Sequence, residues 1–340
     1  MNPLLNPLLL ANILREYLFD TNRVWWSTKE EFERYRDKAI KRIVRHAFIV
    51  PLYHRKYKAA GLTPNDIGGV KDIGKLPIVT KDDLRNAPPH DLIPTGRKTG
   101  GFYMVSTSGS TGRPVTLFTE PYTMFKTLIG FVRVIREHGI SWRKTRMSII
   151  ADLSGGSAEE VYFTGTAIPS LKPFFSLENM QTFHVGDNPE RIIAEMERFN
   201  PEFIGGYPGM LKILAILKRR GKGEHVNPKW IGSSGAILDG YTRKYIEDAF
   251  DAKVFDVYGA TECSPIAFEC RRGNYHVQSD LTHLEFVDQE NNPVSPGEPA
   301  NLLVTRLFGR GTPIVRYAGI SDLVTTTTIG CECSMVTPLI

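Results

Sequence analysis

The chain has 340 residues, of which 41% are hydrophobic, 23% are charged and 10% are aromatic. This composition is typical of a folded globular protein of about two domains, and it excludes collagen-like and disordered chains. The net charge of +5 is small and basic residues are interleaved with acidic ones, so we expect no nucleic-acid partner. The charge suits an anionic small molecule and, equally, an ordinary solvated surface.

Cysteine usage and the first residues bear on the compartment. Four cysteines are too few for a secreted disulfide framework, which predicts a cytoplasmic protein. The Leu-rich residues 1–14 lack the basic start and cleavage site of a signal peptide, and they are too short to span a bilayer. We expect no transmembrane segment and an amphipathic stretch lying on the core, with peripheral membrane contact as the alternative.

The first hundred residues have a helical pattern. Apolar side chains recur at helical spacing over residues 29–57, which predicts one long surface helix. Thr80 with Asp83 three residues later indicates the start of a short helix. We therefore expect residues 1–100 to form a helical segment that packs on the core and carries no chemistry.

The pattern changes to an alternation of strands and helices after residue 100. An extended run at 102–106 precedes a helix at 122–138 and an apolar strand at 147–153. Further helices are predicted at 189–199, 209–219 and 239–250, and further strands at 202–205, 229–233 and 253–257. Such alternation predicts an α/β fold over residues 101–272, with a mostly parallel sheet covered by helices on both faces. Turn-rich strands at 283–287 and 302–308 predict a β subdomain over residues 273–340.

Residues 106–115 read Ser-Thr-Ser-Gly-Ser-Thr-Gly-Arg-Pro-Val and follow a predicted strand. Glycines let backbone amides turn toward an anion and hydroxyls add donors, so this stretch can cradle phosphate; an ordinary Ser/Gly turn is the alternative. No Walker or dinucleotide-binding glycine motif occurs.

The stretch at residues 106–115 resembles the phosphate loop of the adenylate-forming superfamily of acyl- and aryl-CoA ligases. Val115 replaces the Lys of many members, as in the phenylacetate-CoA ligase branch. The resemblance implies that ATP phosphates contact Ser106, Thr107, Ser108, Gly109, Ser110, Thr111 and Gly112.

A second motif, residues 255–262, lies at the end of a predicted strand, where open α/β sheets bind ligands. It is similar to the superfamily's Tyr-Gly-x-Thr-Glu motif. The resemblance implies that Tyr258, followed by Gly259, stacks on adenine and that Asp256 accepts from the adenine amine. It also implies that Thr261 contacts the α-phosphate or the carboxylate and that Glu262 holds Mg²⁺. For an isolated Glu, a surface charge is the alternative.

Two further segments complete the resemblance. The first, Ser234, Gly235 and Ala236, is like the family stretch whose backbone lines the adenine and acyl sites. The second, residues 313–322, is like the family's Arg-Tyr-x-x-Gly-Asp stretch, and the resemblance implies that Asp322 binds the ribose hydroxyls. Asp322 lies one residue farther from Tyr317 than in the commonest form of that stretch. The acid pocket would be lined by Tyr162, Phe163, Gly206 and Tyr207, and for the aromatic residues core packing is the alternative.

The resemblance covers nearly the whole chain and implies the N-terminal core of an adenylate-forming enzyme, with parallel helix-covered sheets and a small β-barrel-like subdomain. We expect ATP-dependent activation of an aryl or aryl-acetic acid to an acyl-adenylate, then thioester formation with coenzyme A and release of AMP. The alternatives are an adenylyltransferase that forms no thioester and a nucleotide-binding lobe with impaired catalysis. We expect the family's small C-terminal lobe to be absent, which leaves the activity of this chain alone open, and we expect a possible homodimer.

The cysteines offer a separate site. Three thiols and one imidazole, at Cys270, His276, Cys331 and Cys333, suit tetrahedral Zn²⁺, and some phenylacetate-CoA ligase relatives resemble this arrangement. Four protein ligands would make such a zinc structural. The alternative is four reduced thiols that bind no metal. Cys263 is expected to remain a free thiol next to Glu262.

Overall fold

The computed structural model describes residues 2–107 and 113–340. Its α-helices are α1 (Pro7–Arg15), α2 (Arg23–Trp26), α3 (Lys29–Phe48), α4 (Pro51–Ala59), α5 (Lys81–Asn86), α6 (Pro121–Glu137), α7 (Ala158–Glu160), α8 (Ala167–Leu171), α9 (Pro189–Phe199), α10 (Pro208–Arg219) and α11 (Gly240–Phe250). Its strands are β1 (Tyr103–Ser106), β2 (Thr116–Thr119), β3 (Met147–Ala151), β4 (Met180–His184), β5 (Phe203–Gly206), β6 (Trp230–Ser234), β7 (Lys253–Ala260), β8 (Ser264–Glu269), β9 (Tyr275–Val277), β10 (Thr282–Val287), β11 (Pro299–Arg306) and β12 (Val324–Thr325).

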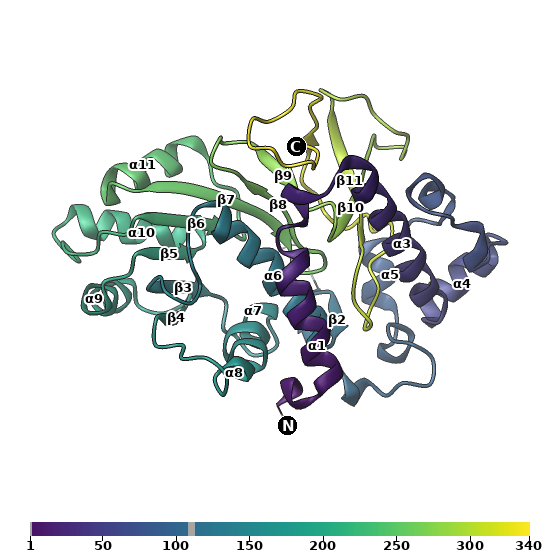
Figure 1. The fold of residues 1–340 in the computed structure, drawn as a ribbon, viewed down its shortest axis with the longest axis horizontal. Helices are drawn as coiled ribbons and strands as arrows, with labels where there is room; N and C mark the ends of the chain where they lie inside the picture. The colour runs from purple at the N-terminus through teal and green to yellow at the C-terminus, as the bar shows by residue number, and fades with distance from the viewer. Residues whose placement is uncertain (1, 108–112) are drawn as a thin grey trace.

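A seven-stranded sheet with the order β4-β3-β5-β6-β7-β8-β9 forms the centre of the fold. Its strands β4 to β7 run parallel, and β8 and β9 add an antiparallel end. Apolar side chains of α9, α10 and α11 pack on one face, and α6 packs on the other (Figure 1). The predicted α/β fold with a mostly parallel, helix-covered sheet is confirmed.

The N-terminal helices and the β subdomain share a second core. Buried residues of α3 and α4 lie in one cluster with residues of the β1–β2 hairpin and of β10 and β11. The predicted β subdomain contains a three-stranded antiparallel sheet with the order β10-β11-β12. Figure 1 shows α3, α4 and α5 beside this sheet, away from α9, α10 and α11.

Several element boundaries differ from those predicted. The long helix expected over residues 29–57 is two helices, because Pro51 cannot donate an amide hydrogen within a helix and begins α4 instead. The short helix after Thr80 is present, and Asp83 completes its capping box. The strand predicted at 253–257 extends to Ala260, while β4, β8 and β9 were not predicted.

The N-terminal helix α1 contacts α6. Leu10 and Ile13 are half-buried against the core, whereas Leu8 is 77% exposed. Just beyond α1, the buried Glu16 carboxylate accepts a hydrogen bond from Lys126 Nζ on α6 at 2.6 Å. None of the helices in the described part of the chain is long and apolar enough to span a bilayer.

Candidate active site

The base of the hydroxyl-rich loop is well defined. Strands β1 and β2 form an antiparallel hairpin in which Ser106 pairs with Thr116. Across the loop, Thr107 N donates to Val115 O and Val115 N donates to Thr107 Oγ1, both at 3.0 Å. Ser106 N donates to Gly156 O at 2.9 Å, which ties the loop to the segment that follows β3. The other predicted phosphate contacts, Ser108, Gly109, Ser110, Thr111 and Gly112, lie outside the described residues.

The second motif follows the sheet, as predicted, and turns sharply at its end. The register of β7 and β8 shifts between Tyr258 and Gly259, and a Cβ on Gly259 would lie 2.9 Å from Ser264 O. Only glycine allows this close approach of the two backbones. The turn places Thr261 half-buried and Glu262 buried between the two strands, at the carboxyl end of β7.

Two motifs that are far apart in sequence meet at this edge. The Tyr258 hydroxyl donates to Asp322 Oδ2 at 3.1 Å. Asp322 is exposed and Tyr258 is half-buried, so both side chains can be reached from solvent. The structure therefore brings the predicted adenine and ribose residues together, although their roles stay predictions.

Asp256, which is predicted to accept a hydrogen bond from the adenine amine, is buried, and that role stays a prediction. It is 8% exposed, and Oδ2 accepts a hydrogen bond from the Tyr275 hydroxyl at 2.9 Å. Its Oδ1 is buried and has no hydrogen-bond partner among the described residues. Burial raises the pKa of the Asp256 carboxyl above its ordinary range.

Glu262 is anchored by two residues that the sequence analysis did not assign. The Tyr317 hydroxyl donates to Glu262 Oε1 at 2.9 Å, and Arg306 Nη1 donates to the Glu262 backbone oxygen at 3.1 Å. Arg306 Nη2 also donates to Thr312 O, and Thr312 Oγ1 accepts from Phe118 N on β2. The β1–β2 hairpin and Glu262 are thus connected through Arg306. Tyr317 is the Tyr that precedes Asp322 in the sequence pattern described above, whereas no sequence signal pointed to Arg306.

Tyr207, one of the residues predicted to line the acid pocket, lies against Gly235. This glycine has φ +84°, and a Cβ added to it would lie 2.5 Å from the ring of Tyr207. The Tyr207 hydroxyl lies 2.9 Å from both oxygens of Glu159 and donates to that carboxylate. Gly206 ends β5 immediately before Tyr207, while Ser234 Oγ donates to Val257 O on β7 at 2.9 Å. Beside Gly235, Ala236 is exposed.

The other two predicted pocket residues lie on a π-helical turn, Val161–Gly165. Burial raises the pKa of Tyr162, whose hydroxyl lies with those of Thr127 on α6 and Ser264 on β8. The hydroxyl of Tyr162 therefore faces the interior of the protein. Phe163 is half-buried, and its role as a pocket wall stays a prediction.

The cysteine and histidine ligands predicted for zinc converge. The ligand atoms of Cys270, His276, Cys331 and Cys333 all lie within 4.8 Å of one another. The sulfurs of Cys270 and Cys331 are 3.7 Å apart, close to the roughly 3.8 Å edge of a tetrahedron with Zn–S bonds of about 2.3 Å. His276 directs Nε2 toward the Cys333 sulfur at 3.0 Å, and its Nδ1 is 3.2 Å from Thr337 Oγ1. That second contact can fix the ring orientation, as partners of metal-bound histidines do. The four donors fit a tetrahedral zinc ion.

Comparison with known proteins agrees with this geometry. The chain is 24% identical over 332 residues to "Phenylacetate-coenzyme A ligase" of Escherichia coli (strain K12), covering 93% of this chain and 68% of that protein. It is 25% identical over 320 residues to the protein of the same name from Thermus thermophilus, covering 90% and 68%. Through these distant relatives, which cover most of it, the chain is similar to the adenylate-forming CoA ligase superfamily. Within that superfamily it is phenylacetate-CoA ligase-like, and it spans about two thirds of the length of these relatives.

One further relative and one solved structure are also similar to the chain. The chain is 25% identical over 266 residues to "Protein CapK" of Staphylococcus aureus, covering 74% of this chain and 55% of that protein. An open conformation of 2-hydroxyisobutyryl-CoA ligase superposes with a TM-score of 0.78 at 20% identity, covering 94% of this chain and 75% of that one. This likeness concerns the fold, and it confirms the predicted core of an adenylate-forming enzyme. No family model matches the chain.

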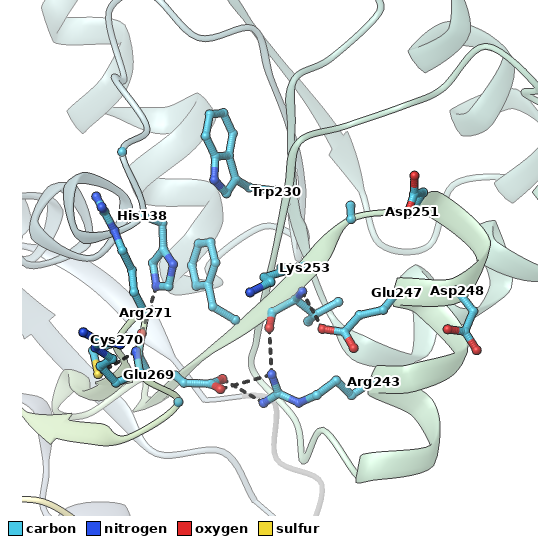
Figure 2. A pocket seen from close by; sticks show the side chains of 16 residues that line it. His138, Trp230, Arg243, Glu247, Asp248, Asp251, Lys253, Glu269, Cys270 and Arg271 are labelled. Carbon is cyan, nitrogen blue, oxygen red and sulfur yellow. Dashed lines mark hydrogen bonds and ion pairs between the residues drawn. The ribbon is translucent and has the colours of Figure 1, made fainter. Parts of the chain in front are cut away.

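A groove of about 1120 Å³ lies at the opposite edge of the sheet, at the amino ends of β6 and β7. It includes Trp230 and Lys253, the first residues of β6 and β7, whereas the motifs lie at the carboxyl ends (Figure 2). Arg243 in the groove is bound to Glu269 at 2.7 Å and to Val254 O at 2.7 Å. Of residues 255–262 this groove is lined by Phe255, whereas Tyr258, Glu262 and Asp322 do not line it, so the carboxyl-end site is the better candidate for the active site.

Proposed function

We propose that the chain activates a carboxylic acid with ATP and then forms a thioester with coenzyme A. A substrate carboxylate oxygen attacks the α-phosphorus of ATP, the bond from that phosphorus to the bridging oxygen breaks, and pyrophosphate leaves. The thiol sulfur of coenzyme A then attacks the acyl carbon, AMP leaves, and the thiol proton is released. The similarity to phenylacetate-CoA ligases supports an aryl-acetic or similar acid.

The observation that carries this proposal is the meeting of Tyr258 and Asp322 at the carboxyl end of β7. An aromatic face for a purine and a carboxylate for two ribose hydroxyls are the groups that nucleoside recognition requires. Thr261 and Glu262 follow in the same turn, where they would meet the phosphates. Tyr207 presents its ring beside Gly235, next to Ser234, and would supply an apolar wall for the acid.

Glu262 fits the role of a magnesium ligand. Its carboxylate is a hard oxygen donor, and Oε2 has no hydrogen-bond partner among the described residues. When bound, magnesium would neutralise charge that develops on the transferred phosphates. We also propose that the Cys270 cluster holds a structural zinc that ties the C-terminal residues to β9, because all four positions of the metal would be filled by protein.

Binding of a non-reactive intermediate analogue tests the nucleotide site. We expect phenylacetyl sulfamoyl adenosine to bind more than about 10-fold tighter than AMP in calorimetry, since it joins both halves of the proposed site. We expect Asp322→Asn to weaken both ligands. Absence of saturable binding by either ligand would refute the proposal.

Pyrophosphate exchange over a panel of aryl, aryl-acetic and aliphatic acids identifies the acid. Product analysis after addition of coenzyme A then separates the two possible outcomes. AMP with a thioester supports the ligase reaction, whereas a stable adenylylated product contradicts the thioester step.

A further inference from the structure

The Glu262 carboxylate has a buried phenol behind it. Tyr317 is fully buried, and its hydroxyl donates to Glu262 Oε1 at 2.9 Å. Glu262 itself is only 5% exposed. A hydrogen bond to a charged group in such surroundings is stronger than one in water and restricts the carboxylate to one orientation.

The position of Tyr317 is fixed on several sides. Its backbone exchanges two hydrogen bonds with Val304 on β11, at 2.9 and 3.0 Å. On the other side, Ala318 N donates to Val79 O at 2.9 Å. The phenol ring lies so close to Gly319 that any Cβ at residue 319 would clash with it. The backbone that carries the phenol is therefore held in place, and from this position the hydroxyl reaches Glu262.

Arg306 secures the same glutamate through its main chain. The Arg306 guanidinium donates to the Glu262 backbone oxygen, and the residue is 5% exposed. The side chain and the backbone of Glu262 are thus held separately, by Tyr317 and by Arg306. This leaves Oε2 as the oxygen with no hydrogen-bond partner in the part of the chain that the structure describes.

We propose that Tyr317 is a positioning residue that aims Glu262 at the magnesium ion of bound ATP, with Arg306 fixing the backbone beneath it. This inference rests on the proposed nucleotide-binding function. The phenol occupies one carboxylate oxygen and directs the other toward the metal. Partners of metal ligands commonly act in this way, and their loss weakens metal affinity or activity by about 10- to 100-fold.

The test compares Tyr317→Phe with Tyr53→Phe. Tyr53 is equally buried, and its hydroxyl donates to Pro313 O at 2.6 Å, so each variant loses one buried phenol hydrogen bond in the same core. Calorimetry measures the affinity for a non-hydrolysable ATP analogue with and without Mg²⁺. The ratio of the two affinities reports the coupling between metal and nucleotide, which a change in stability alone does not alter.

We expect Tyr317→Phe to reduce this coupling about 10-fold or more, while Tyr53→Phe leaves it unchanged. Equal coupling in the wild type and in Tyr317→Phe would overturn the inference. If Tyr317→Phe does not fold, Arg306→Lys carries the test, with the same expected loss and the same refuting result. A wild-type protein that binds no nucleotide would instead refute the proposed function.

Discussion

Substitution of Gly235 by alanine tests the wall between the proposed acid and adenine sites. Gly235 has φ +84°, so alanine there adopts a left-handed conformation that costs about 1–2 kcal/mol. The new Cβ would also lie 2.5 Å from Tyr207 Cε1, about 1 Å closer than ordinary van der Waals contact. The ring must therefore move away, and its hydroxyl then leaves Glu159.

The contact between Tyr207 and Glu159 sets the size of the added effect. A hydrogen bond to a charged group contributes about 1.5–3 kcal/mol, and we take the lower value because both residues are half-exposed. Gly235→Ala should therefore lower the free energy of unfolding by about 3 kcal/mol in total. Gly61→Ala is the matched control, because Gly61 has φ +69° and no atom within 4 Å of an added Cβ.

Urea denaturation of the two variants measures this difference. We expect Gly61→Ala to lose only the backbone term, about 1–2 kcal/mol. We also expect Gly235→Ala, and not Gly61→Ala, to bind the acyl-adenylate analogue more weakly. Equal losses of stability with unchanged analogue binding in both variants would refute the contact between Gly235 and Tyr207 as a wall of the site.

Three further predictions follow from buried groups. The purified protein should contain one zinc ion per chain by mass spectrometry, and Cys331→Ser should lose it while Cys263→Ser retains it. Burial, with nearby Arg36 and Arg316, lowers the pKa of His283 from 6.5 to about 3. Between pH 6.5 and about pH 3 the unfolded chain therefore binds a proton that the folded protein excludes. The free energy of unfolding should decrease by about 1.4 kcal/mol for each unit by which the pH is lowered through this window. His283→Gln should remove that dependence, whereas His54→Gln, at an exposed position, should not. Finally, Arg133→Met should cost about 3–5 kcal/mol in urea denaturation because it leaves buried Asp280 unpaired, and Arg133→Met with Asp280→Leu should cost less.

Controls decide each of these predictions. A metal-free wild type that is as stable as the zinc-loaded protein contradicts a structural zinc. An unchanged pH slope in His283→Gln contradicts its buried neutral state. A loss below about 1 kcal/mol in Arg133→Met would show that Asp280 finds water or another partner.

Periodicity predicted β3, β5, β6 and β7 because apolar runs alternate with amphipathic helices in this part of the chain, whereas the parallel strand β4 was not predicted. Helix α9 begins at Pro189 and ends at Phe199, as the pattern predicted. The antiparallel strands β8 and β9 were not predicted, since the turn after Ala260 depends on the close approach of Gly259 and Ser264 and not on local pattern. Pro51 divides the apolar stripe over residues 29–57 into two helices, and its presence in that stripe was the sequence signal for the break.

The candidate site divides in a similar way. Motif residues such as Tyr258, Glu262 and Asp322 could be chosen from sequence because their order and types match a family pattern. Tyr317, Arg306 and Glu159 act through contacts across long separations, which one sequence does not reveal. The predicted contact of Asp256 with adenine stays a prediction, and the burial of this residue against Tyr275 depends on β9, a strand that was not predicted.

A crystal structure of the protein with AMP tests the central claim most directly. The account predicts that the adenine lies against Tyr258 and the ribose against Asp322, at the carboxyl end of β7. AMP bound in the groove beside Trp230, or anywhere else away from Tyr258 and Asp322, would contradict it.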